Sequence, residues 1–182
     1  LLIVGELGIG NTTAAAAVAA ALLDASAEKI VGRGTGLDDE GMLRKRAVVE
    51  RALIACNATD GASTIMQIGG REIAAMYGAM GRAVERKIPV LVDGFVVGAA
   101  ALALVHDYPE ARDRLIWAHR SAEQGHEHLL KTVDGKGLLD LGMRLGEASG
   151  ALTAFPLLEA ACALHNDMAT FADAQVPEKD ES

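Results

Sequence analysis

The sequence predicts an α/β fold, in which a parallel sheet carries helices on both faces in a Rossmann-like arrangement. Two patterns support this prediction. Short, uninterrupted apolar runs alternate along the chain with longer segments whose apolar residues follow the helical period. The clearest unit opens the chain, where a glycine-rich turn joins the apolar run at 1–4 to an alanine-rich segment. In such sheets ligands bind beyond the carboxyl ends of the strands, so we expect the ligand site at that edge.

The first strand and the first helix follow directly from the opening residues. Residues 1–4 are apolar throughout, as in a buried strand. The helix over 13–24 is rich in alanine, and Asn11 or Thr12 can cap its start.

A second glycine-rich turn, at 32–36, precedes the next predicted helix, over residues 40–56. Asp38 or Asp39 can cap that helix. Its apolar positions roughly follow the helical period, at Leu43, Ala47, Val48, Leu53 and Ile54. A short element, whose type the pattern does not decide, then precedes Gly69-Gly70.

The second half of the chain alternates in the same way. The run at 88–92 is rich in branched residues and predicts a strand that ends at Asp93-Gly94. The other elements expected here are a strand at 114–117 and helices at 72–86, 95–106, 122–133 and 151–170.

The rule for ligand sites in parallel sheets selects four segments. Each contains glycine together with a carboxylate or a hydroxyl group, and they are residues 5–12, Asp93-Gly94, residues 118–125 and residues 145–150.

Composition limits the class of protein. A chain of 182 residues can bury one core, so we expect a single domain over 1–174 and a polar, disordered tail at 175–182. The net charge of −8 and the scarcity of aromatic residues, 3% of the chain, argue against a nucleic-acid partner. No apolar run is long enough to span a membrane, and no signal-peptide pattern is present, so we expect a cytoplasmic protein. Because residue 1 already belongs to a predicted buried strand, we expect that an N-terminal portion is absent.

The first glycine-rich turn comes close to two phosphate-binding loops and matches neither. Gly5 and Gly10 have the spacing of a nucleotide-triphosphate loop, but Asn11 stands where that loop has its lysine. Gly8 and Gly10 begin a dinucleotide fingerprint that lacks its third glycine. Glu6 adds a carboxylate, which is unusual in a loop that only holds phosphate. We therefore predict a phosphate-and-base site of another kind.

A second candidate carboxylate is Glu147, on the small-residue turn at 146–150 before an apolar helix. Such a glutamate is partly desolvated and suits a general base near neutral pH. The alternative is that Glu147 caps the following helix, since a carboxylate favours the positive end of the helix dipole. The spacing alone favours the cap.

Three further side chains have both a structural and a functional interpretation. Ser121 can cap the helix that follows it or meet an anion there. Lys45 can belong to a solvated helix face or fold inward to a phosphate. Asp93 can start the next helix or contact a ribose.

The histidines and cysteines predict no metal site. His126 and His128 lie two positions apart on a predicted helix, so they point to different faces and are expected at the surface. Cys56 and Cys162 have apolar helical neighbours and are expected to be small core residues.

Four motifs occur in a recognisable order. They are Gly5-Glu6-Leu7-Gly8-Ile9-Gly10-Asn11-Thr12-Thr13, Val92-Asp93-Gly94-Phe95, His119-Arg120-Ser121-Ala122-Glu123 and Arg144-Leu145-Gly146-Glu147-Ala148-Ser149-Gly150. Together they resemble the nicotinate-nucleotide–dimethylbenzimidazole phosphoribosyltransferase family, from Leu1 to about Phe171. Four motifs in order are far more specific than one glycine-rich loop. The family chain is longer, and its N-terminal portion is what this sequence lacks.

The resemblance implies an enzyme that transfers 5-phosphoribose from nicotinate mononucleotide to 5,6-dimethylbenzimidazole in cobalamin lower-ligand synthesis. The products are α-ribazole 5′-phosphate and nicotinate, with inversion at the anomeric carbon. The general base of the family falls on Glu147 and a second carboxylate falls on Glu6. The residues expected to bind the substrates are Gly8, Gly10, Asn11, Thr12, Lys45, Asp93, Ser121 and Gly146. The resemblance implies small-molecule substrates, a homodimer, and neither a cofactor nor a metal.

The motifs depart from the family pattern at two positions. Leu7 replaces methionine, which conserves the side-chain volume. Ala148 replaces glycine beside the proposed base, and it strains the turn if that position needs a positive φ.

Two other functions stay open. A Rossmann-type NAD(P)-binding oxidoreductase accounts for Gly8 and Gly10 after a strand, but it needs an acidic ribose-binding residue about 20 residues further on, at the end of a second strand. Glu28 lies near that distance but precedes the apolar pair Ile30-Val31. A nucleotide-binding module or inactive fragment would hold the nucleotide without turnover.

Overall fold

Three strands in the described part of the chain form one parallel sheet. The computed structural model describes residues 1–34 and 36–174, so the predicted tail at 175–182 lies outside the described residues. The sheet has the order β1 (Leu2–Val4), β2 (Val90–Val92) and β3 (Leu115–Trp117). All strands run in one direction, with Leu2, Val90 and Leu115 in register, so their carboxyl ends share one edge. The α/β class and the parallel sheet are confirmed, and each strand begins one or two residues later than predicted.

The helices agree with the predicted segments apart from their ends. They are α1 (Asn11–Leu22), α3 (Asp39–Ala55), α5 (Arg71–Glu85), α6 (Phe95–Asp107), α7 (Gln124–Thr132) and α8 (Ser149–Asp167). The undecided element before Gly69 is the helix α4 (Gly61–Ile68). Two helices were not predicted, α2 (Ala27–Ile30) and the 3₁₀ helix η1 (Pro109–Arg114), because both are too short to show a period in the sequence.

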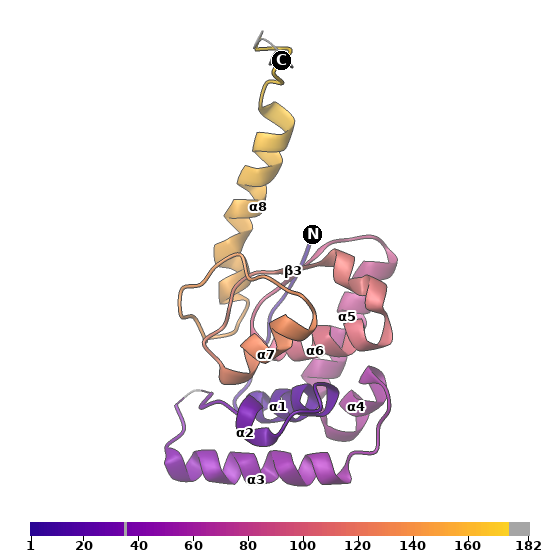
Figure 1. Ribbon diagram of the computed structural model, residues 1–182, viewed down its shortest axis with the longest axis vertical. Coiled ribbons are helices and arrows are strands. Elements are labelled where there is room, and N and C mark those ends of the chain that lie inside the picture. The colour runs from indigo at the N-terminus through magenta and orange to yellow at the C-terminus, as the bar shows by residue number, and fades with distance from the viewer. Residues whose placement is uncertain (35, 175–182) are drawn as a thin grey trace, which may run out of the picture.

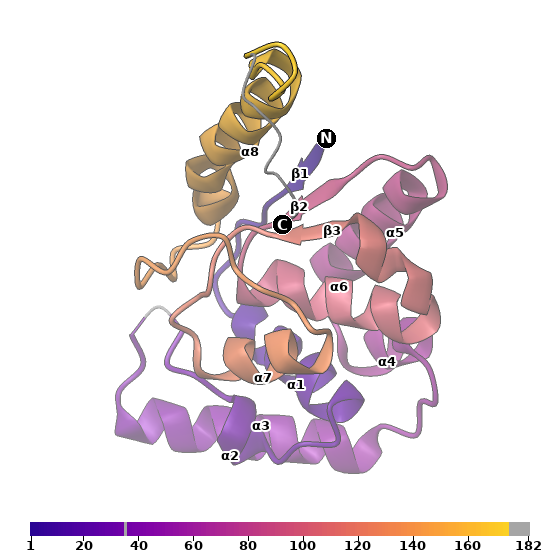
Figure 2. The ribbon, with the colours of Figure 1, turned by 45° about the horizontal axis from the view of Figure 1, so that its top comes forward.

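Helices cover both faces of the sheet (Figures 1 and 2). Side chains of a strand point to alternate faces, and this alternation divides the core. Val90 and Val92 belong to the large cluster on the side of α5 and α6. Leu91, between them, belongs to a smaller cluster with Ala151 and Ala154 of α8. The prediction of helices on both faces is therefore confirmed.

The centre of the large cluster is a contact between two helices built from small residues. Residues 15–20 of α1 are five alanines and Val18, all buried, and residues 95–105 of α6 are buried without interruption. Small side chains let the two helix axes approach closely. Helix α4 also approaches α6 closely, at Gly61, where a Cβ would overlap the backbone of Ala103. Helix α3 covers α1 from outside and forms the outermost layer (Figure 1).

Helix α8 packs only through its first turns and then projects away from the other elements (Figure 1). Its buried residues are Gly150, Ala151 and Ala154, whereas Leu164 is 62% exposed. Because α8 leaves the sheet, Cys162 is exposed, and Cys56, which directly follows α3, is only half-buried, so the expectation of two core thiols is wrong. Within residues 1–34 and 36–174, no helix combines the length and apolar character needed to cross a membrane.

The starts of α1 and α3 differ in how they are capped. Helix α1 begins after Gly10, whose φ is +93°, and no side chain caps it. The predicted cap at Asn11 or Thr12 is therefore wrong, because both residues already lie within the helix. Helix α3 begins after Asp38 as predicted, and the Asp38 carboxylate accepts a hydrogen bond from the Gly41 N–H at 2.8 Å.

Asp107 ties the end of α6 to the start of α4 and to α5. Its carboxylate accepts hydrogen bonds from the N–H groups of Gly61 and Ala62, at 2.5 and 2.9 Å, and from the Tyr77 hydroxyl at 2.7 Å. Burial acts to raise the pKa of Asp107, but these hydrogen bonds together outweigh burial and hold that pKa below its usual value. The carboxylate thus satisfies N–H groups that a helix leaves unpaired at its start.

We expect Asp107→Asn to lower the free energy of unfolding by about 1–3 kcal/mol at neutral pH. Since the folded state lowers the pKa of Asp107, its stabilisation is present above the unfolded pKa and is lost as the pH falls through the folded pKa. Urea titrations at about pH 6 and about pH 3 should therefore show a larger loss of stability in the wild type than in the variant. Asp113→Asn, an exposed carboxylate of η1, is the matched control. Equal losses in wild type and Asp107→Asn would contradict this account.

Candidate active site

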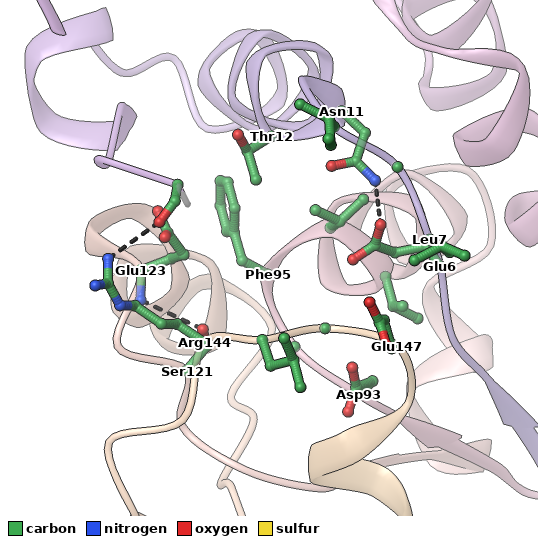
Figure 3. Close-up of a pocket in the computed structure, with 18 of the residues that line it drawn as sticks. Glu6, Leu7, Asn11, Thr12, Asp93, Phe95, Ser121, Glu123, Arg144 and Glu147 are labelled. Carbon is green, nitrogen blue, oxygen red and sulfur yellow. Dashed lines mark hydrogen bonds between the residues drawn. The ribbon is translucent and has the colours of Figure 1, made fainter. Parts of the chain in front are cut away.

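A pocket with a volume of about 340 Å³ lies at the carboxyl edge of the sheet (Figure 3). This is the edge at which the sequence places the ligand site. All four segments selected from the sequence contribute to its wall, including Glu6 after β1, Asp93 after β2, Ser121 after β3 and Glu147 before α8. The parallel register brings the first three together, because the three strands end side by side.

Most of the predicted site residues line this pocket. They are Glu6, Gly8, Asn11, Thr12, Asp93, Ser121, Gly146 and Glu147. Gly10 and Lys45 are not among the lining residues. Gly10 instead adopts the left-handed conformation that turns the chain into α1, a conformation that glycine tolerates best.

Lys45 supports the pocket from behind. Its side chain is 6% exposed, and its ammonium group donates to Thr12 Oγ1 and to the Gly32 carbonyl, each at 2.9 Å. Burial lowers the pKa of Lys45, and the nearby charge of Glu123 opposes that shift. The solvated alternative is therefore wrong for this residue, and Lys45 holds Thr12 against the pocket without lining it.

Glu6 and Glu147 meet although they lie near opposite ends of the described chain. The Glu147 N–H donates to the Glu6 carbonyl at 3.1 Å, and a Cβ at Gly146 would overlap a carboxylate oxygen of Glu6. Burial raises the pKa of Glu6; a hydrogen bond from Asn11 opposes the shift, and the charges of Asp93 and Glu147 add to it. Glu147 is exposed, so the expectation that it is partly desolvated is wrong. The half-buried carboxylate of the pair is Glu6.

The turn that carries Glu147 is a run of left-handed residues. Gly146, Glu147 and Ala148 have φ values of +80°, +58° and +60°. Ala148 is the residue that precedes α8, and no side chain of the turn caps that helix, so the capping role for Glu147 is wrong. Gly5 packs directly on the turn, since a Cβ there would lie 2.6 Å from the Ala148 Cβ. Ala148 thus occupies a position with positive φ, the condition under which the sequence predicted strain.

Asp93 binds the start of α8. Its Oδ1 accepts a hydrogen bond from the Ala151 N–H at 2.8 Å, and the residue is only 1% exposed. His119 Nε2 lies 3.9 Å from the same oxygen. Asp93 does not start the next helix, because Gly94 precedes α6 and no side chain caps it. The carboxylate therefore joins the sheet to α8 at the wall of the pocket.

Ser121 does not cap α7. That helix begins after Glu123, and Ser121 Oγ accepts a hydrogen bond from the Glu123 N–H at 3.3 Å. The Ser121 N–H donates to Nδ1 of His126 at 2.9 Å. His126 is fully buried, so its expected surface position is wrong, whereas His128 is exposed as expected. The reason is that the face of α7 that carries His126 packs against α6.

Three polar residues of the pocket were missed from the sequence. His119 and Glu123 are 3% and 7% exposed, and Arg144 donates to the Gly34 carbonyl at 3.0 Å. Among the pocket-lining residues of the described chain, Arg144 is the only one with a permanent positive charge. All three lie within motifs quoted above, next to residues that were predicted, and this adjacency is the signal that could have found them.

Charge is divided across the pocket. Figure 3 shows Arg144 beside Glu123 on one wall and Glu6, Asp93 and Glu147 on the opposite wall, with Phe95 between the two walls. Such an arrangement can hold an anionic group at one end and accept a proton at the other. In the described residues, no group of three or more His, Cys, Asp or Glu side chains is arranged to hold a metal ion.

A family model described as phosphoribosyltransferase matches residues 1–176. The chain belongs to this phosphoribosyltransferase family. The match spans every segment that lines the pocket.

Relatives of this chain carry a more specific name. The nicotinate-nucleotide–dimethylbenzimidazole phosphoribosyltransferase of Bradyrhizobium sp. (strain BTAi1) is 53% identical, over 99% of this chain and 52% of that protein. The protein of the same name from Pseudomonas aeruginosa (strain PAO1) is 52% identical, over 98% of this chain and 52% of that protein. The crystal structure of CobT from Thermus thermophilus matches with a TM-score of 0.92 and 44% identity, over 98% of this chain and 54% of that chain. The chain thus spans about half the length of these relatives.

We expect Ala148→Gly to raise the free energy of unfolding by about 1 kcal/mol, because glycine adopts the left-handed conformation without the steric cost that alanine incurs. Thermal or urea unfolding would measure this. Ala160→Gly, at an exposed position inside α8, is the matched control and should change stability in the opposite direction by about 1 kcal/mol. A loss of stability in Ala148→Gly would show that the turn is not strained at this residue.

Proposed function

We propose that this chain carries the catalytic pocket of a nicotinate-nucleotide–dimethylbenzimidazole phosphoribosyltransferase. It would move 5-phosphoribose from nicotinate mononucleotide to 5,6-dimethylbenzimidazole, a step of cobalamin lower-ligand synthesis. Family membership supports phosphoribosyl transfer, and the names of relatives at 52% and 53% identity support this pair of substrates.

The observation that carries the proposal is the meeting of Glu6 and Glu147 in one pocket, opposite Arg144. The two glutamates come from separate motifs of the family resemblance, and the contact between their segments places both carboxylates where one substrate can reach them. A base that accepts a proton and a cation that holds a phosphate or carboxylate are the parts that this transfer needs.

The proposed reaction breaks one C–N bond and forms another. The bond between the anomeric carbon and the pyridinium nitrogen breaks, and its electron pair neutralises the pyridinium as nicotinate leaves. One ring nitrogen of dimethylbenzimidazole attacks the anomeric carbon from the opposite face, which inverts it. The other ring nitrogen then loses its proton to Glu147. Glu6, whose pKa is raised by burial, can hold or share that proton next to it.

The remaining parts of the proposal rest on the family resemblance. We propose a homodimer located in the cytoplasm, acting on small-molecule substrates alone. The transfer needs no cofactor, because the pyridinium of nicotinate mononucleotide is itself a good leaving group.

The oxidoreductase alternative lacks its ribose-binding carboxylate. The dinucleotide fingerprint needs an acidic residue at the end of the next strand, about 20 residues past the loop. Glu28 lies in the helix α2, and the next strand, β2, begins only at Val90. Calorimetric titration of the chain with nicotinate mononucleotide and, separately, with NAD distinguishes this alternative from the transferase, because each predicts tighter binding of its own ligand.

The direct test is to incubate the chain with nicotinate mononucleotide and 5,6-dimethylbenzimidazole and to separate the products by chromatography. Formation of α-ribazole 5′-phosphate together with nicotinate is the expected result. Nucleotide binding without product would favour the alternative of a nucleotide-binding module. Absence of nucleotide binding would contradict both.

We expect Glu147→Gln to lower the turnover rate by about 10²–10⁴-fold, since an amide cannot accept the benzimidazole proton. The dissociation constant of nicotinate mononucleotide should change little, because the substitution keeps the shape of the side chain. Glu159→Gln, an exposed glutamate further along α8, is the matched control. Unchanged turnover in Glu147→Gln would remove this residue from the role of general base.

We expect Arg144→Gln to weaken the binding of nicotinate mononucleotide by about 10–100-fold, the loss of one charge-assisted contact. Two analogues identify the anion, namely nicotinamide mononucleotide, which lacks the carboxylate, and nicotinate riboside, which lacks the phosphate. The effect of the substitution should vanish for whichever analogue lacks the group that Arg144 binds. Arg112→Gln, an exposed arginine of η1, is the control. A loss of equal size for all three ligands would mean that Arg144 acts only through the Gly34 carbonyl.

A further inference from the structure

A fully buried histidine stands directly behind Ser121. His126 lies on α7 with no exposed surface, and its Nδ1 accepts a hydrogen bond from the Ser121 N–H at 2.9 Å. The centroid of its ring lies 6.4 Å from that of Trp117 and 6.3 Å from that of His119. The ring also faces α6, because a Cβ at Gly98 would lie 3.5 Å from its Nε2. Neither the family resemblance nor the proposed reaction gives His126 a role.

The hydrogen bond defines the protonation state of His126. An imidazole nitrogen that accepts from an N–H carries no proton, so the ring is neutral and its proton is on Nε2. Burial, and then the neighbouring charges of His119 and Arg120, lowers the pKa of His126 to about 3. The ring therefore remains an acceptor throughout the range near neutral pH.

Packing alone does not account for a histidine at position 126. Its Nε2 is buried and finds no hydrogen-bond partner in the described part of the chain. A buried polar group without a partner lowers stability, so an apolar side chain of similar volume would fill the same space at lower cost. What the apolar side chain cannot do is accept the hydrogen bond from Ser121.

The hydrogen bond leaves one group of Ser121 available to a ligand. The Ser121 N–H is bound by His126, and the Ala122 N–H is bound by the Met143 carbonyl at 3.0 Å. Ser121 Oγ accepts from the Glu123 N–H at 3.3 Å, so its own O–H is the donor that remains at the pocket wall. Figure 3 shows Ser121 on the same side of the pocket as Arg144.

We propose that His126 is a positioning residue that holds the backbone of Ser121, so that the Ser121 hydroxyl donates a hydrogen bond to an oxygen of the nucleotide substrate. The inference rests on the proposed function, because it takes nicotinate mononucleotide as the ligand. His126 does not touch the substrate itself. The imidazole acts as a fixed neutral acceptor, and the contact with the ligand belongs to Ser121.

Two substitutions separate the acceptor from the packing. His126→Asn keeps an acceptor oxygen near the place of Nδ1, whereas His126→Leu keeps most of the volume and removes the acceptor. We expect the dissociation constant of nicotinate mononucleotide to rise about tenfold or more in His126→Leu and to stay within about threefold in His126→Asn. Dimethylbenzimidazole binding should be unchanged in both. His128→Leu, an exposed histidine on the same helix, is the matched control.

A double-mutant cycle tests whether His126 acts through Ser121. In a Ser121→Ala background, His126→Leu should cause no further loss of nucleotide affinity. Additive losses, or equal losses in His126→Asn and His126→Leu, would overturn the proposal. Failure of the wild-type chain to bind the nucleotide would instead overturn the proposed function.

The ring itself supplies a readout that does not depend on the substrate. Nitrogen-15 NMR of the imidazole at neutral pH should show a neutral ring protonated at Nε2, with Nδ1 as an acceptor. A ring protonated at Nδ1, or one that is charged near neutral pH, would overturn the proposal even if the chain proves to be an active transferase. The spectrum also decides the matter if His126→Leu does not fold.

Discussion

The buried hydrogen bond from the Ala151 N–H to Asp93 is the interaction on which the geometry of the pocket depends. Asp93 directly follows the central strand of the sheet, and Ala151 lies in the first turn of α8, so this bond fixes the start of α8 to the carboxyl edge. The turn before α8 is thereby held against the segment after β1, where the Glu147 N–H reaches the Glu6 carbonyl. The anchor at Asp93 thus acts together with the hydrogen bond between the Glu147 N–H and the Glu6 carbonyl to hold the two glutamate segments side by side.

Small residues allow the turn before α8 to lie this close to the segment after β1. A Cβ at Gly150 would overlap the His119 ring, and a Cβ at Gly5 would lie 2.6 Å from that of Ala148. The chain therefore passes through a space that glycine can occupy and larger residues cannot. The cost appears at Ala148, where a residue with a side chain holds a left-handed conformation, φ +60°. Tight packing beside the pocket thus holds a turn with positive φ at the residues that position the Glu147 carboxylate.

The sequence was sufficient for features that depend on local pattern. Apolar runs located β1, β2 and β3, and the rule for parallel sheets then selected the segments that line the pocket.

The sequence was not sufficient where the outcome depends on contacts between distant segments. His126 reads as a surface residue from its spacing to His128, but its burial depends on how α7 packs on α6. The sequence favours Glu147 as a helix cap, but the side chain that accepts a hydrogen bond from the first turn of α8 is Asp93, which binds the Ala151 N–H from more than 50 residues earlier in the chain. The sequence places Lys45 on a helix. It does not show that the side chain points inward, because that depends on the position of Thr12, to which Lys45 donates a hydrogen bond.

The division of charge in the pocket limits how a substrate can lie in it. The proposed substrate, nicotinate mononucleotide, carries a phosphate and a carboxylate, and both would be repelled by the wall formed by Glu6, Asp93 and Glu147. An anion is attracted to the wall of Arg144, where the buried ammonium of Lys45 stands behind Thr12. Glu123 lies near Lys45 and, in Figure 3, beside Arg144, so it offsets part of the positive charge of this wall. In the proposed reaction, the ring nitrogen that loses a proton would then be directed to the carboxylate wall, because an anchored phosphate would occupy the opposite wall. The orientation of the substrates would therefore follow from charge, and the glutamates would only have to accept the proton that this orientation brings to them.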